Sequence, residues 1–228
     1  MIKLRHGNCM DILGKMDTGS VDLIVMDPPY KQDGGAGAGS FGGSQRGYYT
    51  QLSSMSEGIS QDVLKECIRV LKRINIYIYC NKAQLKFYLD FFSSYPVSFN
   101  LLCWHKTNPI PATHNIYLRD TEYILFFRER GVPLYGSYET KHTYFITPVN
   151  KKDKKEWGHP TIKPIEQARI FIQNSSSEGD VILDPYMGTG TTGVAAVSLE
   201  RSFIGVEKDS HWYSVAKNRI RTARDKKR

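Results

Sequence analysis

Short apolar runs alternate with helix-like patterns along most of the chain, and this alternation limits the fold more than any other feature of the sequence. The run 21–26 is typical of a fully buried strand, and it ends at Asp27-Pro28-Pro29 because two prolines cannot continue a hydrogen-bonded ladder. Strands that alternate with helices indicate a mostly parallel sheet with helices on both faces. The 228 residues suit one domain of this α/β class, 1–228.

The local patterns also predict where these elements lie. We expect strands at 3–5, 21–26, 74–80, 97–104, 122–128, 180–183 and 203–206, and helices at 9–15, 61–71, 81–92, 164–174, 191–199 and 211–224. Two segments carry no such pattern. The glycine-rich stretch 31–58 is predicted to be a flexible loop at an active site, because loops of this length in compact domains are usually lids or binding loops. The stretch 131–157 is expected to be irregular.

Charge and composition exclude several classes of protein. The net charge is +8, but the tail 217–228 carries +6 and the run 151–155 carries +3, so the remainder is close to neutral. A basic balance permits a nucleic-acid partner without requiring one, and a solvated helix end explains the tail equally well. The apolar runs are too short to span a membrane, and no apolar signal region follows the N-terminus. Four scattered cysteines indicate neither a zinc site nor disulfides, so we expect a reduced cytoplasmic protein without a metal.

A glycine-rich turn near the C-terminus indicates a nucleotide-type cofactor site. The predicted strand that ends near Asp184 runs into Gly188 and Gly190, which permit a tight turn and a close approach to a ligand. Glu207 ends the next predicted strand, at the distance where a carboxylate accepts ribose hydroxyls. The alternative is that Glu207 simply begins the following helix.

The tetrapeptide Asp27-Pro28-Pro29-Tyr30 suggests a site for a planar amine. It presents a carboxylate, two rigid prolines with fixed carbonyls, and one aromatic ring. The carboxylate and a carbonyl can accept the two N–H groups of the amine while the ring stacks on its plane. A proline-rich turn without any function is the alternative for the tetrapeptide alone.

Together the two motifs resemble a known family. Asp-Pro-Pro-Tyr after an apolar strand, with 184–192 far downstream, is similar to the β subgroup of S-adenosylmethionine-dependent DNA amino-methyltransferases, whose motif order is circularly permuted. Residues 7–24, 104–109 with 122–125, and 159–164 resemble further blocks of that family. The resemblance implies a Rossmann-like methyltransferase domain with a small target-recognition insertion, which we expect at 129–158.

The resemblance also implies roles for individual residues. The catalytic residues would be Asp27, Pro28, Pro29 and Tyr30. The cofactor S-adenosylmethionine would be bound by Asn8, Asp27, Thr161, Lys163, Asp184, Tyr186, Gly188, Gly190, Thr191, Thr192 and Glu207. Two positions depart from the family pattern, which commonly has Asp at position 8 and Phe at position 186. For His159 we favour a role in positioning the cofactor turn over one as a general base, and Lys163 reaches either the cofactor or solvent.

The implied substrate is an amine on a base inside duplex DNA, which must be flipped out to be reached. Tyr30 is the candidate for replacing the lost stacking, a contribution of about 1–3 kcal/mol per base. The side chains expected to contact DNA are Lys31, Arg46, Lys106, His114, Arg119, Lys151 and Lys152.

The predicted function is therefore adenine-N6 methylation of double-stranded DNA. Cytosine-N4 methylation is the nearest alternative, although Asp at position 27 favours adenine where Ser is commoner for cytosine. An RNA or protein-amide methyltransferase, which usually carries Asn there, and a catalytically silent DNA-binding relative are the others. Candidate partners are a second copy of the chain and a cognate restriction endonuclease. The expected setting is the cytoplasm of a bacterium or archaeon, or a phage-encoded enzyme, at the nucleoid when on DNA.

Overall fold

The computed structural model describes residues 1–31, 58–109, 111, 115, 117–149, 155–158 and 162–226. Several residues with predicted roles lie outside these ranges, as does almost all of the expected loop 31–58. Those residues are Arg46, His114, Lys151, Lys152, His159 and Thr161.

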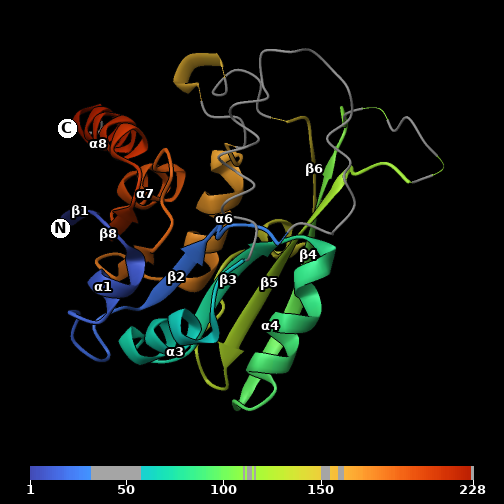
Figure 1. Cartoon of the computed structure of the whole chain (residues 1–228), viewed down its shortest axis with the longest axis horizontal. Helices are drawn as coiled ribbons and strands as arrows, with labels where there is room; N and C mark the ends of the chain where they lie inside the picture. The colour runs from blue at the N-terminus through green and yellow to red at the C-terminus, as the bar shows by residue number, and fades with distance from the viewer. Residues whose placement is uncertain are drawn as a thin grey trace.

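The described residues form one eight-stranded sheet in the order β1-β8-β7-β2-β3-β5-β4-β6 (Figure 1). The strands are β1 (Ile2–His6), β2 (Leu23–Met26), β3 (Asn75–Cys80), β4 (Val97–Lys106), β5 (Thr121–Glu129), β6 (Tyr144–Thr147), β7 (Val181–Asp184) and β8 (Ser202–Glu207). The pairs β1–β8, β8–β7, β7–β2, β2–β3 and β4–β6 are parallel, whereas β5 is antiparallel to both β3 and β4. The predicted mostly parallel sheet is confirmed.

Helices cover both faces of this sheet, as expected (Figure 1). One face packs against α1 (Cys9–Leu13), α3 (Gln61–Val70) and α4 (Leu85–Phe92), and the other against α6 (Ile165–Ser175), α7 (Thr191–Ser198) and α8 (Ser210–Asp225). Alternate residues of each strand enter the two cores. In β3, for example, Ile76 and Ile78 face α3 and α4, whereas Tyr77 and Tyr79 face α6. Burial on both faces explains why these strands are continuous apolar runs in the sequence.

Local capping explains where two of the helices begin. Ser60 accepts a hydrogen bond from the Val63 N–H and starts α3 as predicted. Asn81 and Gln84 form a capping box, but this box starts the short 3-10 helix η1 (Lys82–Gln84), which then leads into α4.

The stretch 131–157 is not wholly irregular, which corrects the expectation from sequence. It contains a 3-10 turn, η2 (Glu139–Lys141), and the strand β6, which pairs with β4 at the edge of the sheet. Four residues at an edge give too short an alternation to stand out among polar neighbours, and only the pairing with β4 makes them a strand. Among the residues that the structure describes, no helix combines the length and apolar character needed to cross a membrane.

Candidate active site

The two sequence motifs meet at the carboxyl ends of the parallel strands. Asp27 directly follows β2, Asp184 ends β7 and Glu207 ends β8, and these three strands are parallel neighbours. From β2 the chain crosses to β3 through α3, whereas from β7 it crosses to β8 through α7, so the connections diverge between the two strands. Open α/β sheets bind their ligands at the carboxyl ends of strands where connections diverge in this way.

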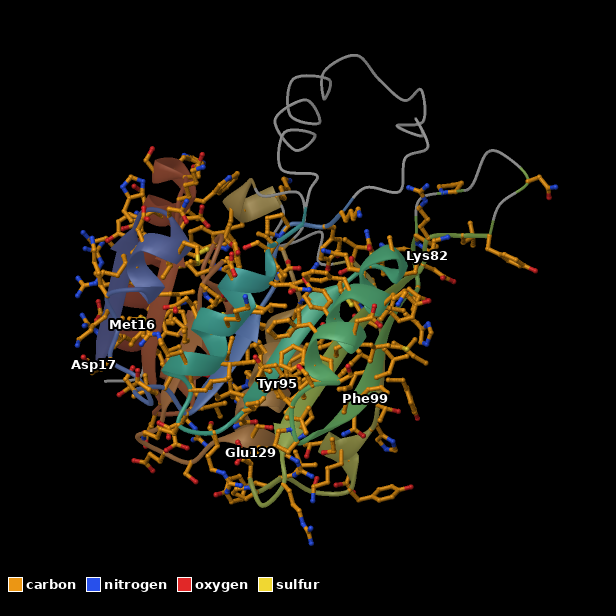
Figure 2. The ribbon with its side chains drawn as sticks, turned by 60° about the horizontal axis from the view of Figure 1, so that its bottom comes forward. Met16, Asp17, Lys82, Tyr95, Phe99 and Glu129 are labelled. Carbon is orange, nitrogen blue, oxygen red and sulfur yellow. The ribbon has the colours of Figure 1, made fainter. Side chains whose placement is uncertain are left out.

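The opposite end of the sheet, away from the carboxyl ends of the parallel strands, forms a different surface from the one with the two motifs. Lys82 lies just beyond the carboxyl end of β3, whereas Tyr95 and Glu129 lie at the opposite end of the molecule (Figure 2). A surface hollow of about 440 Å³ at that opposite end is lined by Tyr95, Glu129 and their neighbours. It therefore has no part in the site formed by the two motifs.

The glycine-rich turn after β7 is held by its own carboxylate. Asp184 is 3% exposed, and its Oδ1 accepts the Tyr186 N–H at 3.0 Å. Burial raises the pKa of Asp184 to about 7, although hydrogen bonds from the Thr192 hydroxyl and the Tyr186 N–H oppose that rise. Near neutral pH this carboxyl group therefore lies close to its titration midpoint.

Gly190 and Gly188 both have positive φ values, but their surroundings differ. Gly190 has φ +82°, and a Cβ there would lie 3.0 Å from Ile220 Cδ1 and 3.1 Å from Ala216 Cβ, so the turn and α8 are packed too closely for a side chain. Gly188 has φ +49°, and no atom lies within 4 Å of the position its Cβ would take. The backbone at Gly188 consequently borders open space.

Glu207 connects the end of β8 to this turn. Its Oε2 accepts the Gly188 N–H at 2.9 Å and its Oε1 accepts the Asp209 N–H at 2.7 Å. Burial raises the pKa of Glu207 from its ordinary value, while these N–H groups oppose that rise. Each carboxylate oxygen keeps a second lone pair, so Glu207 can still accept ligand hydroxyls. The following helix is capped by Asp209, whose side chain accepts the Trp212 N–H, so Glu207 is not the residue that begins it.

Asn8 and Tyr186 lie beside the same turn. The Asn8 side chain accepts the Met10 N–H at 2.9 Å and caps α1, and its carbonyl oxygen keeps a second lone pair. The Cys9 thiol donates to the Tyr186 hydroxyl at 3.3 Å and ties the turn to α1. Cys9, Cys67 and Cys80 are buried and Cys103 is half-buried, all as free thiols.

Asp27 and Tyr30 belong to a charged cluster that the sequence did not reveal. The Lys163 ammonium lies 3.1 Å from Asp27 Oδ2 and 2.7 Å from Glu122 Oε2, and it donates to the Tyr30 hydroxyl at 3.0 Å. The Tyr30 hydroxyl donates in turn to Glu122 Oε2 at 3.0 Å. On its other side Glu122 pairs with Lys106 at 2.6 Å. Two ammonium groups and two carboxylates thus form one balanced network.

Burial makes this network strongly coupled. Side-chain exposure is 10% for Lys163, 16% for Glu122, 17% for Lys106 and 28% for Asp27. Burial alone would raise the pKa of Glu122, but Lys163 and Lys106 bring it down to about 2. The pKa of Asp27 is raised by burial and by Glu122, against the opposing effect of Lys163. Burial and the nearby carboxylates raise the pKa of Tyr30, which therefore stays a neutral phenol.

The chain on either side of Tyr30 is anchored from η1. The Pro29 carbonyl accepts a hydrogen bond from Gln84 Nε2 at 3.1 Å, and the Lys31 carbonyl accepts one from Asn81 Nδ2 at 2.7 Å. Pro28 is buried. These contacts fix the backbone of the tetrapeptide, so its carboxylate and ring are presented on a rigid support.

The structure gives Lys163, Lys106 and Glu122 contacts that the sequence did not predict. The buried ammonium of Lys163 contacts Asp27 and Glu122 rather than solvent, and its contact with the cofactor stays a prediction. Lys106 was expected at a DNA surface, whereas its ammonium is half-buried against Glu122. Glu122 is the second residue of the antiparallel strand β5, whose start lies beside the carboxyl end of β3, as the pairing of Tyr123 with Cys80 shows. Of the other expected DNA contacts, Lys31 and Arg119 are exposed.

The fold and the site together define an α/β enzyme with a nucleotide-type cofactor turn beside a carboxylate-aromatic cluster. The sequence model of the N6_N4_Mtase family, described as DNA methylase, matches residues 21–218. The chain belongs to this DNA methylase family, which confirms the predicted class of enzyme and its DNA substrate.

Individual relatives agree with this assignment. The chain is 30% identical over 240 residues to the type II methyltransferase M2.DpnII of Streptococcus pneumoniae, covering 95% of this chain and 88% of that protein. The crystal structure of an M1.HpyAVI–SAM complex is similar, with a TM-score of 0.72 and 23% identity over 96% of this chain and 99% of the other. The cytosine-N4-specific PvuII DNA methyltransferase has a TM-score of 0.73 and 14% identity, covering 99% of this chain and 92% of that one. The predicted Rossmann-like methyltransferase fold is confirmed.

Proposed function

We propose that this protein methylates the exocyclic N6 amine of a flipped-out adenine in double-stranded DNA, with S-adenosylmethionine as the methyl donor. The observation that carries the proposal is the position of Asp27, which lies at the carboxyl end of β2, next to the strand that leads into the cofactor turn. The carboxylate that would accept the amine and the nucleotide-type ligand site therefore follow the carboxyl ends of two neighbouring strands.

The residues at the turn fit S-adenosylmethionine. Gly188 borders open space, so a ligand can approach the backbone there. Glu207 keeps lone pairs for the two ribose hydroxyls, and Asp184, Tyr186, Thr191 and Thr192 surround the same turn. When bound, S-adenosylmethionine supplies an electrophilic methyl group.

The catalytic tetrapeptide acts on the base. The lone pair of an exocyclic amine is conjugated into the ring, which makes the amine a poor nucleophile. Asp27 and the Pro28 carbonyl accept its two N–H groups, which localises the lone pair on nitrogen and fixes its direction. Tyr30 stacks on the base and replaces the stacking lost on flipping. Because the pKa of Asp27 is raised, its carboxylate can also hold the proton that the amine releases.

Cytosine-N4 methylation is the second candidate, because the cytosine-N4-specific PvuII enzyme shares this fold. Asp rather than Ser at position 27 favours adenine. We further propose that 31–58 is an active-site and DNA loop and that 129–158 recognises the target sequence, with Lys31 and Arg119 contacting phosphates. We also propose that the protein forms a homodimer and has a cognate restriction endonuclease as a partner. Its proposed location is the cytoplasm.

The test is to express the protein in a host that lacks DNA methylation and to sequence the DNA by a modification-sensitive method. N6-methyladenine in one recurrent sequence is the expected result, and methylcytosine would overturn the choice of base. Asp27→Ala should abolish methylation while isothermal titration still detects S-adenosylmethionine binding. A variant with near-normal turnover would remove Asp27 from the mechanism.

A further inference from the structure

Lys163 has a donor arrangement that the proposed chemistry does not use. An ammonium group has three N–H donors, and those of Lys163 are directed to Asp27 Oδ2, Glu122 Oε2 and the Tyr30 hydroxyl. Two of these partners, Asp27 and Tyr30, belong to the tetrapeptide that receives the base. The ammonium therefore lies in contact with two of the residues that are proposed to bind the base.

The charge of this ammonium is secured by its surroundings. Burial would lower the pKa of Lys163, but the carboxylates of Asp27 and Glu122 outweigh that effect and raise it. Lys163 is also close to two aromatic rings, with Nζ 5.0 Å from the Tyr30 ring centre and 5.2 Å from that of Tyr79. Lys163 therefore stays a cation and a hydrogen-bond donor beside Asp27 and Tyr30 across the neutral pH range.

We infer that Asp27 and Lys163 together read the amidine edge of the target base, with Asp27 accepting from the exocyclic amine and Lys163 donating to the adjacent ring nitrogen. In adenine these atoms are N6 and N1. The contact of 3.1 Å between Asp27 and Lys163 opens, and each group exchanges its partner for an atom of the base, so no donor or acceptor is lost. This inference rests on the proposed function and assigns a substrate-contacting role to Lys163.

The same pair disfavours guanine and thymine, but not cytosine. Guanine and thymine present a carbonyl oxygen beside a ring N–H, which is the reverse of the amidine pattern. A carbonyl would then meet the Asp27 carboxylate and an N–H would meet the Lys163 ammonium, so both contacts would be repulsive. Glu122 has a positioning role here, because it holds the Lys163 ammonium through a second contact at 2.7 Å.

The test combines the replacement of one atom in the base with the replacement of one side chain in the protein. The substrate is a duplex of the methylated sequence in which the target adenine is replaced by 1-deazaadenine, which keeps the N6 amine but has C–H in place of N1. For the wild-type protein we expect the single-turnover rate to fall by about ten- to a hundredfold, the usual effect of losing a hydrogen bond to a charged group. For Lys163→Met the same base change should cost a factor at least about tenfold smaller, because the contact is already absent.

A matched control separates recognition from general damage to the cluster. Lys106 contacts the other oxygen of Glu122 and is buried to a similar extent. Lys106→Met should therefore keep the wild-type sensitivity to 1-deazaadenine even where its overall rate is lower. Equal sensitivity in the wild type, Lys163→Met and Lys106→Met would overturn the inference.

Two further measurements keep the inference testable. If Lys163→Met does not fold, Lys163→Gln keeps an N–H donor without the charge and should show an intermediate sensitivity. Equilibrium binding of the two duplexes, measured by fluorescence anisotropy with the unreactive analogue sinefungin, should show the same pattern without any turnover. If the wild type methylates cytosine, the proposed choice of base fails, and the inference is tested unchanged with 3-deazacytosine, because cytosine N3 lies beside its amine in the same way.

Discussion

Replacing Glu122 with glutamine removes the carboxylate that pairs with the half-buried ammonium of Lys106 and the buried ammonium of Lys163. Glutamine has nearly the same shape, but it can place only one oxygen against Lys106 or Lys163, and its NH2 group must face the other. Lys163 then keeps the Asp27 carboxylate as its only ion-pair partner among the described residues, and Lys106 loses the carboxylate with which it pairs. The perturbation is therefore electrostatic rather than steric.

The expected loss of stability can be obtained in two ways. Removing one partner from a buried ion pair typically costs about 3–5 kcal/mol. Separately, the pKa of Glu122 lies at about 2 instead of 4.5, and a shift of this size corresponds to about 3 kcal/mol. The two values agree, so at neutral pH we expect Glu122→Gln to lower Tm by about 6–20 °C in a domain of this size.

The pH dependence gives a sharper test than the loss itself. Because the pKa of Glu122 is lowered in the folded state, its contribution is complete above the ordinary value of 4.5 and is lost as the pH falls towards 2. The difference in Tm between wild type and Glu122→Gln should thus be constant from neutral pH to about pH 5 and shrink below that. Circular dichroism melts over this range measure both quantities.

The control is an exposed ion pair. Lys86 and Asp90 lie 2.5 Å apart with side chains 83% and 62% exposed, so Asp90→Asn should change stability by less than about 1 kcal/mol. A Glu122→Gln variant that melts no lower than Asp90→Asn, or a difference in Tm that does not shrink in acid, would refute the electrostatic account of the cluster.

Three further predictions concern the cofactor turn. Gly190→Ala should destabilise the fold more than Gly179→Ala in thermal unfolding, because both have similar positive φ values but only the first would place a Cβ against Ile220; equal losses would mean that packing is unimportant there. Glu207→Gln should weaken S-adenosylmethionine binding about ten- to a hundredfold by isothermal titration, and unchanged affinity would exclude a ribose contact. Burial raises the pKa of Asp184 to about 7, so its stabilising effect is complete below 3.8 and is lost as the pH rises towards 7. Asp184→Asn should then lose less Tm than the wild type between about pH 4 and pH 7, and parallel curves would contradict this.

The two motifs of the site could be predicted from the sequence, because each depends on the conformational preferences of residues that are close together in the chain. Two prolines had to end the strand before Asp27, and the glycines after Asp184 had to form a turn. Glu207 had to follow within one crossover unit. Each of these statements depends on residues that are close in the sequence, and the parallel sheet then places all the strand ends at one edge.

The charged cluster could not be predicted from residues that are close together in the sequence. Glu122, Lys106 and Lys163 come from the start of β5, the end of β4 and the turn before α6. Glu122 reaches the site only because β5 is antiparallel and therefore begins where its neighbours end. The strand β6 was missed for a related reason, because its four residues become a strand only through pairing with β4.

By itself, the sequence determined the class of fold, the two motifs and the edge of the sheet where they meet, because periodicity, proline and glycine act over a few residues. Only the tertiary structure decided which carboxylate meets which ammonium group, since those contacts depend on strand order, direction and register across the whole chain. The buried network around Lys163 belongs to the second kind. Its charges are stable only because distant segments bring two carboxylates and two ammonium groups together out of water.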